Sequence, residues 1–227
     1  METLKKIGWE VLEYLRRGLT PFFIKLMFGM TMLAVLFIEN IELRTILVVL
    51  LVAADGFLSF MLMRSAGEMA YKMKVVGQLR KENKPTGSAE TAGAYRPCKE
   101  YRTYKGVIIG IVASLVAIVL VVVSGLTGSA GARVALMFVC GWAYVPVAAV
   151  YMIILSSTGM EVIPVSSVWY SFILIVIFIV LCEIGYILGG NKEKLRQFML
   201  ERSMQSVEKG KAARQQNKEQ GQGAKRR

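Results

Sequence analysis

Apolar residues in this chain gather into long uninterrupted runs rather than the short alternations of a soluble domain. Runs of roughly 17 to 22 residues recur, about the length that crosses a ~30 Å hydrocarbon layer as a helix. The pattern therefore predicts an all-α integral membrane protein. The runs cover residues 22–38, 45–63, 106–124, 134–155 and 168–189.

The segment before the first run, residues 1–21, has a different pattern. Its apolar residues recur at helical spacing and its charged residues fall on the opposite face. The apolar set is Leu4, Ile7, Val11, Leu15 and Leu19, and the charged set is Lys5, Lys6, Glu13, Arg16 and Arg17. Because a proline interrupts helical hydrogen bonding, Pro21 should end the helix. We expect an amphipathic helix that lies in the headgroup plane.

Polar segments divide the rest of the chain into four parts. Residues 22–64 should form a transmembrane hairpin, and residues 65–105 a basic cytosolic loop with a flexible link at 86–94 after Pro85. Residues 106–190 form a second membrane region that contains the broken segment 134–155. Residues 191–227 form a basic cytosolic tail, weakly helical to about Val207 and disordered beyond it, because the remainder is rich in Lys, Gln and Gly.

Basic residues show which side of the membrane each polar segment occupies. Of the 28 Lys and Arg residues, which outnumber 16 Asp and Glu, five lie at the start of the chain, ten in residues 64–105 and eleven after Gly190. Positively charged segments stay on the cytosolic side. The N-terminus, the long loop and the C-terminus are therefore all expected in the cytosol, as in a protein of the bacterial plasma membrane.

Three apolar stretches follow the long loop, yet an even number of crossings is needed to return the tail to the cytosol. Residues 134–155 are the best candidate for a stretch that does not cross, because Gly141 and Pro146 weaken a continuous helix. Trp142 and Tyr144 favour an interface. We predict four transmembrane helices and one broken re-entrant or interfacial segment; the alternative is five transmembrane helices with an outside tail.

The composition excludes several classes of chemistry. The chain has no histidine, the commonest general base and metal ligand near neutral pH. Cys98, Cys140 and Cys182 are too far apart in the sequence for a zinc or redox motif. No nucleotide-binding motif is present. We therefore assign no catalytic residue, no metal site and no cofactor.

Asp55 is the only aspartate in the chain and falls near the middle of the second apolar run. A charge at that depth costs ~3 kcal/mol or more, so the carboxyl group should be protonated or paired. We favour a neutral carboxyl group that hydrogen-bonds Thr31, Ser59 or Ser114. The alternative is an ion- or proton-coupling site.

Two further charged residues lie within predicted spans, Lys25 in the first and Glu183 in the last. Both should lie in the cytosolic leaflet, so an ion pair between them is geometrically allowed. A lysine near a helix end can also extend its ammonium to the headgroups. We favour this snorkelling arrangement for Lys25.

Glycines recur at four-residue spacing at the cytosolic ends of two predicted spans. These are Gly106 with Gly110, and Gly185 with Gly189. Small residues at this spacing let two helix backbones approach closely. We predict that the two glycine pairs pack against each other within the chain, with homodimerisation as the alternative.

These features favour a non-enzymatic membrane protein, an accessory subunit or scaffold of a membrane complex. Its expected partners are the lipid bilayer, anionic lipid headgroups attracted to the basic loop and tail, and a membrane protein or further copies of the chain. Nucleic acid is disfavoured, because Tyr and Lys/Arg near a span are ordinary interface anchors. The alternative is a small oligomeric transporter or channel with Asp55 as its coupling group.

Overall fold

The computed structural model describes residues 2–81, 97–158 and 163–224, which are mostly helical and contain no strand. Five helices in this part of the chain are long and apolar enough to cross a membrane, as expected of an integral membrane protein. The all-α prediction is confirmed. The elements are α1 (Glu2–Val35), α2 (Ile41–Lys81), η1 (Pro97–Lys99), α4 (Lys105–Thr127), α5 (Ala130–Thr158), η2 (Val165–Tyr170) and α6 (Ser171–Ala224). The link predicted at 86–94 lies outside the described residues.

Helices α1 and α2 each bury one narrow face. The buried positions recur every three or four residues, so they form a single stripe on a helix of 3.6 residues per turn. On α1 the stripe comprises Gly18, Pro21, Lys25, Gly29 and Met32. On α2 it includes Val48, Asp55, Ser59, Met63, Gly67 and Ala70. The α1 stripe carries one charged residue, Lys25, whereas the α2 stripe carries two, Arg44 and Asp55.

The prediction that the first helix ends at Pro21 is wrong. Helix α1 continues through this proline, which is fully buried. A proline within a membrane helix is tolerated where neighbouring helices hold the chain on both sides. Here Gly18 lies against Val112 of α4, and Gly29 lies against Trp142 of α5.

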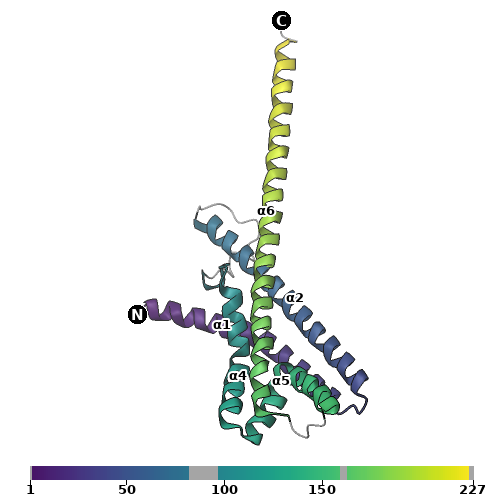
Figure 1. The fold of residues 1–227 in the computed structure, drawn as a ribbon. Helices are drawn as coiled ribbons and strands as arrows, with labels where there is room; N and C mark the ends of the chain where they lie inside the picture. The colour runs from purple at the N-terminus through teal and green to yellow at the C-terminus, as the bar shows by residue number, and fades with distance from the viewer. Residues whose placement is uncertain (1, 82–96, 159–162, 225–227) are drawn as a thin grey trace.

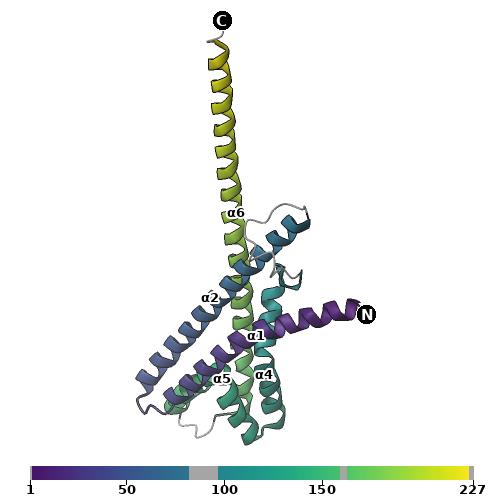
Figure 2. The ribbon, with the colours of Figure 1, turned by 180° about the vertical axis from the view of Figure 1, so that it is seen from behind.

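Helices α4 and α6 lie side by side and run in opposite directions (Figures 1 and 2). Gly110, near the start of α4, lies against Ile179, whereas Gly125, near its end, lies against Trp169. The first residue of α6 is therefore close to the last residue of α4. Helix α2 runs parallel to α6, since Gly56 faces Leu181 and Gly185 faces Phe60.

Helix α5 is interrupted at Cys140, whose backbone is not helical (φ −125°, ψ 36°). The sequence predicts an interruption here from Gly141 and Pro146, but only the first position breaks; the helix continues through Pro146. Beyond the break, Trp142 contacts Phe178 and Tyr151 contacts Tyr170. The second half of α5 therefore runs antiparallel to the first turns of α6, from Phe178 back towards Tyr170.

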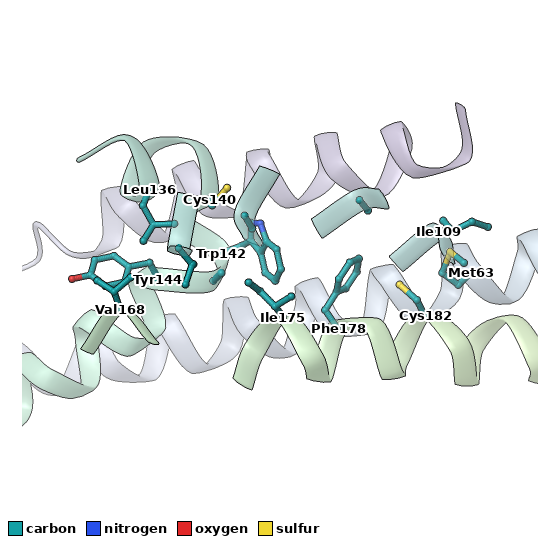
Figure 3. Close-up of a cluster of buried hydrophobic side chains, with 14 of the residues drawn as sticks. Met63, Ile109, Leu136, Cys140, Trp142, Tyr144, Val168, Ile175, Phe178 and Cys182 are labelled. Carbon is teal, nitrogen blue, oxygen red and sulfur yellow. The ribbon is translucent and has the colours of Figure 1, made fainter. Parts of the chain in front are cut away.

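The buried core follows α6 through the bundle. Figure 3 shows Ile175, Phe178 and Cys182 in a row along this helix, with Trp142 packed over the first two. From Cys140 to Val145, at and just after the break in α5, the residues are fully or almost fully buried. The interruption in α5 is therefore enclosed by the other helices.

Helix α6 extends far beyond the rest of the molecule (Figure 1). It has 54 residues, and between Glu193 and Val207 no residue after Glu193 is buried. The sequence predicts disorder beyond Val207, whereas the structure is helical to Ala224. The segment is rich in Lys, Glu, Gln, Arg and Ala, which are good helix formers, so local propensity favours the continued helix.

Candidate functional site

An ion pair between Lys25 and Asp55 lies inside the bundle. The Lys25 Nζ atom donates a hydrogen bond to Oδ2 of Asp55. Lys25 is 3% exposed and Asp55 4% exposed, because each occupies the buried stripe of its helix. The pair joins α1 to α2 and keeps both charges away from lipid.

Two aromatic rings cover the ammonium group of Lys25. Its Nζ lies 4.4 Å from the ring centroid of Trp142 and 4.1 Å from that of Phe178. A cation is attracted to the face of an aromatic ring, more strongly where water is excluded. Because Trp142 belongs to α5 and Phe178 to α6, four helices meet at this one lysine.

The break in α5 brings Trp142 to this position. Gly141 approaches Gly29 of α1 so closely that a Cβ atom on Gly141 would lie 2.7 Å from the carbonyl oxygen of Gly29. A Cβ on Gly29 would lie 2.8 Å from the backbone nitrogen of Trp142. The contact therefore requires glycine on both helices. It places the backbone of Trp142 beside Gly29, one helical turn beyond Lys25, and the indole reaches the Lys25 ammonium group.

The structure gives Asp55 a different partner from those the sequence predicts. Thr31 is exposed and donates to the carbonyl oxygen of Met27. Ser59 and Ser114 are buried, but among the described residues their hydroxyl groups have no hydrogen-bond partner. The snorkelling prediction for Lys25 is also wrong, since its side chain turns inward. A carboxylate within reach stabilises the ammonium group there.

Glu183 lies elsewhere and does not pair with Lys25. Its Oε2 atom accepts a hydrogen bond of 2.8 Å from the backbone N–H of Val107, in the first turn of α4. The N-cap residue of α4, Tyr104, makes no side-chain capping bond. The first N–H groups of a helix lack internal partners and attract negative charge. Glu183 therefore caps α4 from α6.

The two glycine pairs pack on different helices, so the predicted mutual packing is not observed. Gly106 and Gly110 face α6, and a Cβ on Gly106 would lie 2.5 Å from Oε2 of Glu183. Gly185 and Gly189 face α2 instead, and a Cβ on Gly189 would overlap the carbonyl oxygen of Arg64. Helix α6 is thus held closely on two sides, and Gly106 makes room for the capping carboxylate.

Three tyrosines gather where α4 begins. Tyr101 stacks on Tyr186, with ring centroids 5.2 Å apart, and meets Tyr71 edge-on at 5.8 Å. Partial burial and the nearby charge of Glu183 raise the pKa of Tyr101 above its usual value of 10.0. Tyr101 therefore contributes to helix packing, not only to the interface anchoring that the sequence indicates.

Three cavities of the described chain, of about 200, 400 and 280 Å³, are lined by neither Lys25 nor Asp55. Among the described residues, no three His, Cys, Asp or Glu side chains gather to hold a metal ion. One atom of the pair, Oδ1 of Asp55, is buried without a hydrogen-bond partner in this part of the chain.

The two aromatic residues of this site were not identified from the sequence. The sequence indicates an interface position for Trp142, and Phe178 is one apolar residue among many in its span. A signal existed for Lys25, since Gly18, Pro21, Lys25 and Gly29 repeat at helical spacing. Comparisons with protein-family models, curated proteins and solved structures found no match.

Proposed function

We propose that this chain is a non-enzymatic membrane protein, an accessory subunit or scaffold of a membrane complex. The observation that carries the proposal is the part of α6 beyond the bundle. From Leu195 to Val207 it exposes large apolar side chains, among them Phe198 at 49% and Met199 at 59%. Exposed apolar groups on a helix that leaves the bundle are typical of a surface that binds another protein.

The buried pair supports the same proposal. Lys25 and Asp55 neutralise each other, and Trp142 and Phe178 cover the ammonium group. Such a closed cluster holds four helices in one arrangement, which suits a rigid base for the α6 extension. We propose that a membrane protein or a second copy of the chain binds there, and that anionic lipid surrounds the basic cytosolic segments.

We propose a topology of four crossings, by α1, α2, α4 and α6, with α5 as a broken re-entrant segment. The support is that both ends of α5 lie near one end of the bundle. Helix α5 starts three residues after Thr127, the last residue of α4. Val165, which follows the far end of α5 in the chain, lies beside Gly128, since a Cβ atom on Gly128 would be 3.9 Å from it. The basic N-terminus, long loop and tail are then all cytosolic, in a bacterial plasma membrane.

Labelling in intact cells tests this topology. A membrane-impermeant thiol reagent should not react with Cys98, and external protease should spare a tag at the C-terminus. Modification of Cys98 from outside, or loss of the tag, would contradict the four crossings. The same cells made permeable provide the positive control for both probes.

Purification from native membranes in mild detergent tests the scaffold proposal. A Phe198→Ser/Met199→Ser variant should elute at a smaller size than the wild-type chain, because it lacks the apolar contact with the partner. The matched control, Lys194→Ser/Glu201→Ser, changes two polar residues of the same helix and should keep the larger size. Equal sizes for all three proteins would refute the proposal.

A transporter or channel is the second candidate, favoured by two features of the site. Oδ1 of Asp55 is buried without a partner among the described residues, and α5 is interrupted at Cys140, two residues before the Trp142 that covers Lys25. Broken helices near the membrane midplane often form ion sites. Proton flux into vesicles containing the purified chain, abolished by Asp55→Asn in a protein that still folds, would establish this function instead.

A further inference from the structure

A second polar site lies between α1 and α2, apart from the Lys25 pair. It is a cavity of about 280 Å³ at the end of the bundle where α4 begins. Three basic side chains line one part of it, those of Arg16, Arg17 and Lys99. The rest of the lining is mostly apolar and includes Leu62 and Met69. The cavity thus combines positive charge with an apolar wall.

The positive charge of this cavity is only partly balanced. Glu13 is the only acidic residue in the lining, and it already accepts a 2.7 Å hydrogen bond from Nε of Arg17. Within the described chain, neither Arg16 nor Lys99 makes an ion pair. The Nη1 atom of Arg17 is buried without a partner there. A buried donor of this kind is costly unless an acceptor is supplied.

We propose that this cavity binds one anionic phospholipid of the cytosolic leaflet. The lipid phosphate contacts Arg16, Arg17 and Lys99, since guanidinium and phosphate groups form strong charge-assisted hydrogen bonds. An acyl chain lies along Leu62 and Met69. Basic pockets between transmembrane helices on the cytosolic side are a known mode of binding acidic headgroups.

The position of the cavity favours a lipid over a soluble phosphate. Met69 is 62% exposed, and Arg16 is also exposed, so the cavity opens outward between its two helices. Lys105, the first residue of α4, holds the neighbouring backbone through bonds to the carbonyl oxygens of Cys98 and Glu100. Lys99 is thereby fixed near the expected headgroup level. The leaflet assignment rests on the proposed topology, whereas the chemistry of the site does not.

Native mass spectrometry of the purified full-length chain tests the proposal. Phosphatidylglycerol should bind at least tenfold more tightly than phosphatidylcholine. The Arg16→Gln/Lys99→Gln variant should lose most of that preference, because each basic contact contributes about a three- to tenfold effect. Arg16 is exposed and Lys99 is only partly buried, so both substitutions should be compatible with folding. Should the double variant not fold, Arg16→Gln alone should still lower the preference severalfold.

A matched control separates this site from general surface charge. Arg196→Gln/Arg202→Gln removes the same charge from the exposed part of α6 and should change the lipid preference less than twofold. Equal loss in the control, or no preference in the wild-type chain, would overturn the proposal. Displacement of the lipid by millimolar glycerol 3-phosphate would also overturn it, because the occupant would then be a soluble phosphate. Binding is measured without a partner protein, so the scaffold proposal can fail independently.

Discussion

Replacing Asp55 by leucine leaves the Lys25 ammonium group inside the bundle without its carboxylate. Removing one partner of a buried ion pair costs about 3–5 kcal/mol, because a buried charge is left uncompensated. The rings of Trp142 and Phe178 remain over the ammonium group and offset part of that loss, about 0.5–2 kcal/mol. We therefore expect Asp55→Leu to lower the free energy of unfolding by about 2–4 kcal/mol.

Removing both charges should cost much less than removing one. A Lys25→Met/Asp55→Leu double variant contains no unpaired charge, and replacing a buried pair by apolar residues is often nearly neutral. A simple hydrogen bond between membrane helices contributes only about 0.6 kcal/mol on average. A coupling energy of about 2 kcal/mol or more therefore distinguishes an ion pair from an ordinary interhelical hydrogen bond.

The assay is a double-mutant cycle measured by unfolding in detergent micelles, with helix content as the signal. Thr31→Val is the control, since Thr31 is exposed and bonds only the backbone of its own helix; it should change stability by less than about 0.5 kcal/mol. If Asp55→Leu is equally harmless, or if the double variant costs the sum of the two single ones, the buried pair does not hold the bundle together.

Three more predictions concern the packing around α6. Gly189→Ala places a Cβ against the backbone of α2 and should destabilise the chain by about 1–3 kcal/mol. The control is Gly8→Ala, which should not destabilise it because Gly8 has open space around it. Equal thermal unfolding temperatures for the two variants would refute this packing. Glu183→Leu removes the cap on α4, so hydrogen exchange at the Val107 amide should become faster; an unchanged rate would contradict the capping role. Burial and Glu183 raise the pKa of Tyr101, so its contribution to stability is fully present below about pH 10 and is lost as the pH rises further. The absorbance difference between the wild-type chain and Tyr101→Phe should therefore titrate above pH 10, and a midpoint at or below 10 would contradict the burial of this ring.

The helices and the interruption in α5 could be predicted because they depend on composition and local geometry. Apolar runs must be long enough to cross the bilayer, and Gly141 marks a weak point in any helix. The depth of Asp55 follows from counting residues along a helix of known rise. None of these inferences requires knowledge of which helices are neighbours.

The contacts of the site depend on that knowledge and could not be predicted in the same way. Lys25 can reach the headgroups or a buried carboxylate, and the rotation of α1 against α2 decides between them. Glu183 caps α4 only because the start of α4 lies beside residues 179–186 of α6. Pro21 would end an isolated helix, but contacts with α4 and α5 keep α1 continuous.

During biosynthesis, Lys25 and Asp55 reach the translocon on consecutive helices, before α4, α5 and α6 have been made. Inserted alone, each charged residue would add roughly 2.5–3.5 kcal/mol to the free energy of entering the bilayer. Inserted together, the ammonium and carboxylate groups can pair at once. We therefore expect helices α1 and α2 to enter the lipid as one unit, with Trp142 and Phe178 closing later over a lysine that is already neutralised.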